Sequence, residues 1–184
     1  MPVNAYAASP AYNLTVIASA NATAGSPSGI TVHLDNGGTP VAGAAVSLSV
    51  SGGSISPASV TTNASGYATA IFSAPTTAGT VTLTASNANS PTVNQPIQVI
   101  GGRPASMMIS SANSTLMRAN TGNAFIYKVS LNDTYGNPCG SASVNVTVDG
   151  SLSTMITAQD GTVTSSLGPT SSSHTYNVTV NSAN

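Results

Sequence analysis

Charge is what this sequence has least of. Its 184 residues include three Lys and Arg and four Asp, and Glu is absent. Charged residues make up 4% of the chain, whereas about 25% is typical of globular domains. Three basic residues are too few for a nucleic-acid-binding surface, which needs a basic patch. Because the net charge is −1, repulsion contributes little to solubility, and we expect the protein to assemble or to carry an attached hydrophilic group.

Cysteine and long apolar segments are also scarce. The single cysteine, Cys139, excludes a disulfide bond within the chain. Its place in the sequence pattern matches that of Val41, which predicts a buried small apolar side chain, with a reactive thiol or an intermolecular disulfide bridge as the alternatives. No apolar run is long enough to cross a membrane as a helix. Residues 5–7, AYA, resemble the end of a signal peptide, so we expect the numbering to begin near a processing site.

Residues able to perform catalysis or hold a metal are few and dispersed. His33 and His174 have no Cys or Asp at metal-ligand spacing, and no serine lies in a Gly-x-Ser-x-Gly motif. Asp35 and Asp133 each precede a glycine turn, where a turn cap is the simpler interpretation. The alternative, Ca²⁺ binding, needs about six oxygen ligands and usually several carboxylates. The sequence therefore predicts that the protein is not an enzyme and that it has no cofactor.

What the chain does have is a repeated β pattern. Apolar and polar residues alternate, and Gly, Pro, Asn or Asp interrupt them about every eight to twelve residues, as in an all-β sandwich. Residues 35–50, DNGGTPVAGAAVSLSV, align with residues 133–148, DTYGNPCGSASVNVTV. Residues 79–85, GTVTLTA, align with residues 174–180, HTYNVTV. The repeat predicts two tandem immunoglobulin-like β-sandwiches.

The two copies differ in their last strand. The domains are expected at residues 11–101 and 102–184, after an N-terminal arm of residues 1–10. The first copy continues after its repeat with residues 91–100, PTVNQPIQVI, whereas the second has only NSAN. An unfinished sheet leaves an apolar groove and unpaired backbone groups. The residues expected to line this acceptor groove are Met107, Ile109, Tyr176, Val178 and Val180.

The expected strands number seven in the first copy and six in the second. Those of the first copy are 12–19, 29–35, 44–51, 57–62, 67–73, 80–86 and 93–100. Those of the second are 106–111, 123–131, 142–149, 153–158, 161–166 and 174–180.

Asn-x-Ser/Thr sequons, seven in number, are distributed along the chain. Asn145 and Asn177 alternate with apolar residues, so their side chains point away from the core. No sequon falls on a predicted core face, which favours N-glycosylation at several of them. The alternative is that Asn serves simply as a surface and turn residue. The seven positions are Asn13, Asn21, Asn63, Asn113, Asn132, Asn145 and Asn177.

Three segments of the first copy resemble the bacterial immunoglobulin-like repeats of invasin and intimin. They are residues 35–50, residues 62–68 (TNASGYA) and residues 79–85. The second copy shares the pattern over residues 133–150 and in the pair Asp160-Gly161. The resemblance implies a modular, rod-building unit on a cell surface and no common active site.

The N-terminal arm has no counterpart in the repeat. It is apolar and uncharged, and its prolines favour an extended backbone. Residues 2–4, PVN, are similar to residues 92–94, TVN, of the strand that the second copy lacks. We expect the arm to leave its own subunit and to complete the acceptor groove of a neighbour. The residues expected to enter are Pro2, Val3, Asn4, Ala5, Tyr6, Ala7 and Ala8.

A donor at one end and an acceptor at the other make a head-to-tail contact, which gives filaments when it does not close into a ring. Strand donation is known in chaperone–usher pili, and two-domain glycosylated subunits joined in this way resemble archaeal thread filaments. The sequence thus predicts an extracellular, N-glycosylated filament subunit whose partners are copies of itself and other cells or surfaces. The alternative is an adhesin or surface-layer fragment in which the last strand follows in a longer chain. A carbohydrate-binding accessory domain is a more distant hypothesis.

Overall fold

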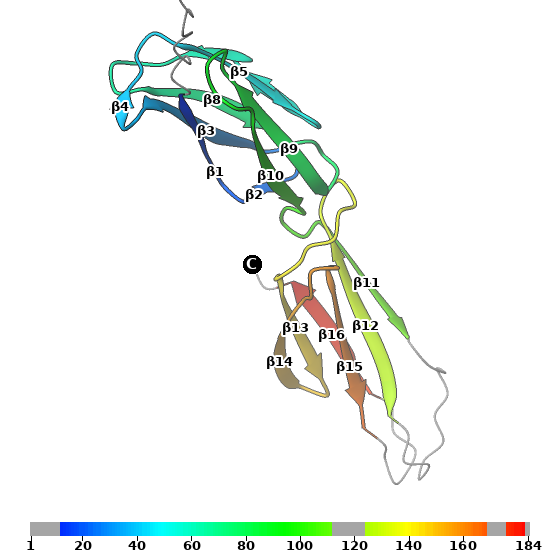
Figure 1. Ribbon diagram of the computed structural model, residues 1–184. Coiled ribbons are helices and arrows are strands. Elements are labelled where there is room, and N and C mark those ends of the chain that lie inside the picture. The colour runs from blue at the N-terminus through cyan, green and yellow to red at the C-terminus, as the bar shows by residue number, and fades with distance from the viewer. Residues whose placement is uncertain (1–11, 112–123, 169–175, 183–184) are drawn as a thin grey trace, which may run out of the picture. The chain divides into compact units, whose positions relative to one another are not determined.

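The fold consists of two β units. The computed structural model describes residues 12–111, 124–168 and 176–182. Contacts divide the chain between Val99 and Ile100 into unit 1 and unit 2. Every regular element of the described part is a strand, and each unit contains two antiparallel sheets (Figure 1). The all-β, immunoglobulin-like class predicted from the alternating pattern is confirmed.

Unit 1 has ten strands in two sheets. The first sheet has the order β1-β3-β8-β6, with β4 paired to β3, and the second has the order β2-β10-β9-β5-β7. Their bounds are β1 Asn13–Ala18, β2 Asn21–Thr23, β3 Pro27–Asn36, β4 Thr39–Pro40, β5 Ala45–Val50, β6 Ser54–Ser56, β7 Ser59–Thr61, β8 Tyr67–Ser73, β9 Gly79–Ser86 and β10 Val93–Ile100.

Unit 2 has six strands in its described residues. One sheet has the order β11-β12-β15 and the other has the order β14-β13-β16. Their bounds are β11 Ser106–Ser111, β12 Phe125–Asn132, β13 Ser143–Val148, β14 Ser151–Ile156, β15 Thr162–Leu167 and β16 Val178–Ser182.

In unit 1, the two-residue alternation of apolar and polar residues matches the alternation of buried and exposed side chains. Along β8, Ala68, Ala70 and Phe72 are buried, while the residues between them are exposed. Side chains alternate between the two faces of a strand, so this sequence can bury only one set. Phe72 and Leu83 are fully buried on facing sheets and pack in the same core cluster.

The strand predictions were wrong in detail at three places. The expected strand 57–62 corresponds to β7, whereas the short strands β2, β4 and β6 were not predicted. β14 begins two residues before the expected 153–158. β16 begins at Val178 rather than at 174, although 174 and 175 lie outside the described residues. Short Ser-rich segments such as β6 have one apolar residue, so they give no periodic signal.

Two glycines mark the same place in the two units. Gly66 has φ of +76° and Gly161 has φ of +70°. A Cβ atom would lie 2.5 Å from the carbonyl oxygen of Leu34 at Gly66 and 2.6 Å from that of Leu131 at Gly161. Only glycine combines this backbone conformation with so close an approach. Leu34 and Leu131 are therefore corresponding positions.

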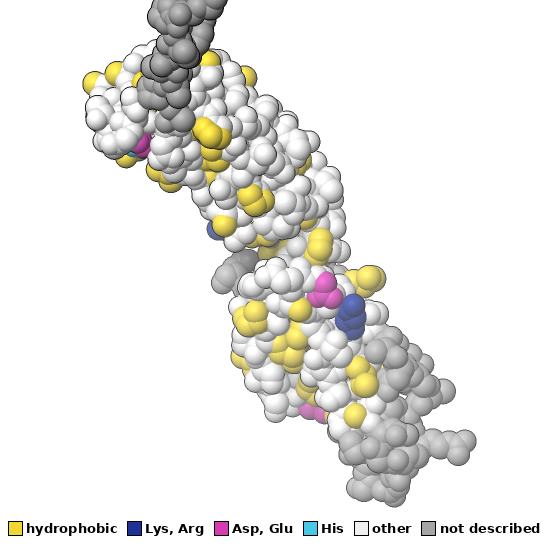
Figure 2. All heavy atoms as spheres, in the orientation of Figure 1, with side chains coloured by type: hydrophobic (Ala, Val, Ile, Leu, Met, Phe, Trp, Pro, Cys, Tyr) yellow, Lys and Arg dark blue, Asp and Glu magenta, His cyan; other side chains and the backbone are white. Residues whose placement is uncertain are grey.

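The surface is polar without being charged. On the face drawn in Figure 2, uncharged polar side chains and backbone dominate, and few charged groups are visible. Within the described segments, no helix is long and apolar enough to span a bilayer.

Candidate functional site

The open flank of unit 2 is the edge of the sandwich formed by β16 and β11. β16 pairs with β13 on one side, from Val148–Val178 to Val144–Ser182. No strand among residues 12–111, 124–168 and 176–182 pairs with its other side. In unit 1 the corresponding strand, β9, has neighbours on both sides, β5 and β10 (Figure 1). The flank therefore exposes a strand edge that unit 1 covers.

The side chains of β16 can be compared with those of β9, because β13 pairs with β16 as β5 pairs with β9. Val50 and Val148 hold the same repeat position, and their cross-strand partners are Leu83 and Val178. One step further, Leu48 and Val146 are partnered by Ala85 and Val180. Leu83 and Ala85 are 0% exposed, whereas Val178 and Val180 are only partly buried.

The other wall of the flank shows the same difference. Leu14 faces Leu34 on β3, and Met107 faces the corresponding Leu131 on β12. Leu14 is 6% exposed and Met107 is 37% exposed. Two residues along, Ile109 is 49% exposed. The structure thus brings Met107, Ile109, Val178 and Val180 to one flank.

In unit 1, β10 provides the cover. It pairs antiparallel with β9, from Val93–Ala85 to Val99–Gly79. Its residues Ile97 and Val99 are 1% and 0% exposed, and they belong to the core cluster that contains Leu83. Val93 packs against the cluster that contains Leu14. One strand therefore buries both walls of the flank in unit 1.

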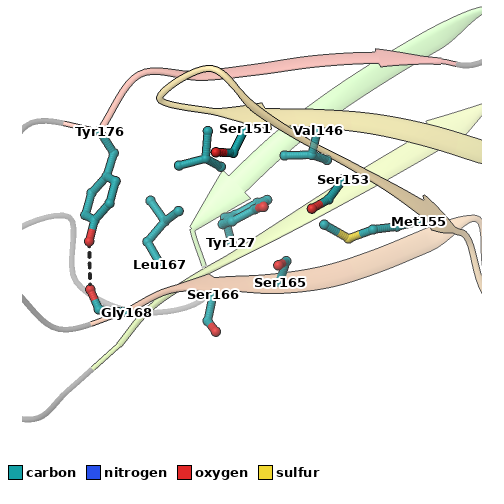
Figure 3. Close-up of a pocket in the computed structure, with 11 residues that line it drawn as sticks. Tyr127, Val146, Ser151, Ser153, Met155, Ser165, Ser166, Leu167, Gly168 and Tyr176 are labelled. Atoms are coloured by element: carbon teal, nitrogen blue, oxygen red, sulfur yellow. Dashed lines mark hydrogen bonds between the residues drawn. The ribbon is translucent and has the colours of Figure 1, made fainter.

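Tyr176, the fifth predicted groove residue, lies elsewhere. Its side chain lines a pocket at the opposite flank of unit 2, and its hydroxyl donates a hydrogen bond of 2.9 Å to the carbonyl oxygen of Gly168 (Figure 3). The predicted donor residues 2–8 lie outside the described residues.

Six of the seven sequon asparagines are in the described part, and none of the six is buried. Asn13, Asn21, Asn63 and Asn177 are exposed, while Asn132 and Asn145 are half-buried. Asn113 lies outside the described residues. The Nδ2 atom of Asn13 donates to Oδ2 of Asp35 over 3.1 Å. A glycan on that nitrogen leaves one N–H for the same bond.

Asp35 and Asp133 cap turns, as predicted. Oδ1 of Asp35 accepts the backbone N–H of Gly38, and this bond, with a smaller contribution from Asn13, lowers the pKa of Asp35 despite some desolvation. Burial raises the pKa of Asp133, but hydrogen bonds from Asn137, Gly102 and Tyr135 outweigh it and lower the net pKa. Both carboxylates are thereby committed to turns rather than to a ligand.

The remaining candidate groups do not assemble into a reactive site. Cys139 is 1% exposed within the core of unit 2, and burial raises the pKa of its thiol. His33 stacks on Tyr67 with ring centroids 4.3 Å apart, and its Nδ1 lies 3.8 Å from Asp35. In the part of the chain that the structure describes, no three His, Cys, Asp or Glu side chains come together as a metal site would require.

Comparison with known families gives a match over unit 1. Residues 11–99 match the family model described as invasin, domain 3. The match supports the predicted resemblance of this segment to invasin-type immunoglobulin-like repeats. A comparison with curated protein sequences gave no match.

Solved structures extend the similarity in fold to both units. The Escherichia coli adhesin FdeC has a TM-score of 0.63 at 19% identity, covering 95% of this chain and 60% of that one. The D0-D1 domain of intimin has a TM-score of 0.43 at 21% identity, covering 91% and 89%. The Yersinia pseudotuberculosis adhesin InvE has a TM-score of 0.44 at 22% identity, covering 96% and 56%. The chain thus spans somewhat over half of the FdeC and InvE chains. The predicted likeness to thread filaments stays a prediction.

Proposed function

We propose that this chain is an extracellular, cell-surface structural protein whose unit 2 is completed by a β-strand added to the open flank. The donor is the arm of residues 1–10 of a second copy, so that copies join head to tail into a filament. The observation that carries the proposal is the difference between corresponding positions. Leu83, Ala85 and Leu14 are covered by β10, whereas Val178, Val180 and Met107 are not.

The energetics favour such an addition. An eight-residue strand in this flank buries roughly 400–600 Å² of apolar surface, worth on the order of 10 kcal/mol at about 25 cal/mol per Å². Ordering the arm and bringing two copies together costs at least about 5 kcal/mol of this. The added strand also pairs the free backbone edge of β16, as β10 pairs β9. The arm carries no charge that would have to be desolvated.

A second candidate function is an adhesin built from tandem immunoglobulin-like units. It is favoured by the invasin-type match of unit 1 and by the fold shared with the adhesin FdeC. In that case a strand from later in the same polypeptide fills the flank. The two proposals agree on a cell-surface location and differ in the source of the strand.

Removing the arm tests the proposal directly. The full chain is expected to form filaments visible by negative-stain electron microscopy, whereas residues 11–184 are expected to elute as a monomer. A synthetic peptide of residues 1–10 should then raise the midpoint temperature of the shortened protein, and a scrambled peptide should not. If both proteins are monomers of equal stability, strand donation by the arm is wrong and the tandem-domain adhesin is favoured.

N-glycans complete the proposal, because a protein in which 4% of all residues are charged needs another source of surface hydration. Glycopeptide mass spectrometry of the protein from its native source is expected to find hexose-containing adducts at the exposed sequons first. Asn63 is the strongest candidate, since it is exposed and its Oδ1 already accepts the N–H groups of Ser65 and Tyr67, which orients Nδ2 outward. Unmodified peptides at all four exposed positions would contradict this part.

A further inference from the structure

Unit 2 has a second open flank, on the side away from β16. There β15 ends one sheet and β14 ends the other, and no strand of the described residues pairs with the outer edge of either. A pocket of about 280 Å³ lies between them, with β14 on one wall and β15 on the other (Figure 3). None of its lining residues is charged.

The pocket exists because a connection is short. Val60 pairs with Val46 in unit 1, and Met155 pairs with the corresponding Val144 in unit 2. Nine residues separate Val50 from Val60, whereas six separate Val148 from Met155. The three extra residues let the chain of unit 1 cross to the other sheet and form β6 before it returns as β7. In unit 2 the shorter connection stays on one sheet as β14.

β6 shows what fits this place. It pairs with the edge of β8, and Ile55 lies opposite Phe72. Ile55 packs against both core clusters of unit 1, so it closes the gap between the sheets. Its neighbours on the strand, Ser54 and Ser56, are exposed. A single branched aliphatic residue between small polar ones is therefore enough to fill the gap.

Strand pairing identifies the residue of β15 that corresponds to Phe72 of β8. Phe72 faces Ser28 on β3, and Leu167 faces Phe125 on β12. Ser28 and Phe125 each lie six residues before the corresponding leucines, Leu34 and Leu131. Leu167 thus takes the place of Phe72, and Ser166, Leu167 and Gly168 all line the pocket.

A tyrosine side chain contributes a hydroxyl group to the pocket. Tyr127 is 3% exposed, and its side chain points into the cavity toward Ser153 and Ser165 (Figure 3). A hydroxyl group can both donate and accept a hydrogen bond, so a segment that enters the pocket can pair a polar group with it.

We propose that this second flank docks an uncharged, extended segment of a partner protein, which adds to β15 as a strand. The segment places one isoleucine or valine opposite Leu167, in the pocket, and small residues opposite Ser166 and Gly168. Its backbone pairs the free edge of β15, and its polar groups reach the Tyr127 hydroxyl. This site is separate from the β16 flank, and the proposal for it does not depend on the proposed filament assembly.

The probe for this site is the chain's own β6. A labelled peptide of residues 51–58, SGGSISPA, is expected to bind the full chain saturably in fluorescence anisotropy. The same peptide with Ile55→Ser should bind at least tenfold more weakly, because the pocket then gains no apolar side chain. Hydrogen–deuterium exchange should show protection over residues 162–167 and not over β16. Absence of saturable binding, or protection on β16 instead, overturns the proposal.

Matched variants distinguish binding in the pocket from nonspecific binding of the peptide. Ser165→Ile fills the cavity from the inner face of β15 and is expected to abolish peptide binding, while Thr164→Ile, on the outer face, should leave it unchanged. Thermal unfolding verifies that both variants are folded. A second variant replaces residues 149–154 by residues 51–59, which supplies an internal β6 and should also abolish binding. Equal binding by Ser165→Ile and the wild-type chain, or displacement of the probe by the arm peptide 1–10, overturns the assignment.

Discussion

Met107→Asp is expected to abolish filament formation, whereas Met108→Asp leaves it intact. The two methionines are adjacent on β11, but only Met107 faces the flank, opposite Leu131. Met107 is 37% exposed, so a carboxylate there remains hydrated while the flank is open. Covering the flank would bury that carboxylate as Leu14 is buried in unit 1. An unpaired buried charge costs several kcal/mol, so association should weaken by a factor of about 1,000.

The measurement is sedimentation velocity of the two variants with electron microscopy of the same samples. The Met107→Asp monomer should keep the unfolding midpoint of the arm-deleted protein, which shows that the loss is in association. Below about pH 4 the introduced carboxyl is protonated, so the variant should recover part of its assembly. Filaments of Met107→Asp at neutral pH, or equal loss with Met108→Asp, would show that this wall does not contact a donor.

The sequence predicts the sandwich class and most of the acceptor flank because both follow from period-two alternation. Val178 and Val180 alternate with polar residues on β16, so their inward direction is fixed locally. On β11 the apolar Met108 lies between Met107 and Ile109, and their direction follows from their pairing with Leu131 and Val129 on β12. The repeat then shows that a strand corresponding to β10 does not follow within these residues. Alignment of the two copies is thus enough to identify the edge of β16 as the open one.

Tyr176 and the second pocket could not be predicted in the same way. Tyr176 continues the alternation of β16, yet its long side chain reaches the opposite flank and bonds to Gly168. The pocket depends on whether a connection crosses between sheets, and Ser54-Ile55-Ser56 gives no strand signal. The pairing of Ile55 with Phe72 shows that β6 fills the gap between the two sheets of unit 1. The corresponding connection of unit 2 is three residues shorter and forms no such strand.

The described residues of unit 2 form a sandwich with fewer strands than unit 1. Unit 1 closes one flank with β10 and the other with β6. The described part of unit 2 has neither, while its central ladder, β13 against β16 and β12 against β15, is intact. Its core of seven buried residues, including Val129 and Val144, is correspondingly smaller than the two clusters of nine in unit 1. A strand added to unit 2 would therefore bury further apolar side chains and raise its free energy of unfolding.

Supplying that strand within the chain is expected to stabilise unit 2 and to prevent assembly. In residues 11–184, positions 183 and 184 are replaced by residues 88–100, because Asn87 of unit 1 corresponds to Ser182. The added strand can pair with β16 as β10 pairs with β9. Completing the burial of four partly exposed side chains is worth about 4 kcal/mol, and the strand's own apolar residues and ladder hydrogen bonds offset most of its ordering cost.

A net gain of about 3 kcal/mol corresponds to a rise of more than about 10 °C in the midpoint temperature of a unit of this size. Differential scanning calorimetry measures it, with unit 1 as the internal reference whose transition should not move. The control extension carries Ser at the three apolar positions that correspond to Val93, Ile97 and Val99, and it should leave the midpoint unchanged. The extended protein should also fail to bind the arm peptide, because the flank is occupied. A rise without loss of arm binding would mean that the arm docks somewhere other than beside β16.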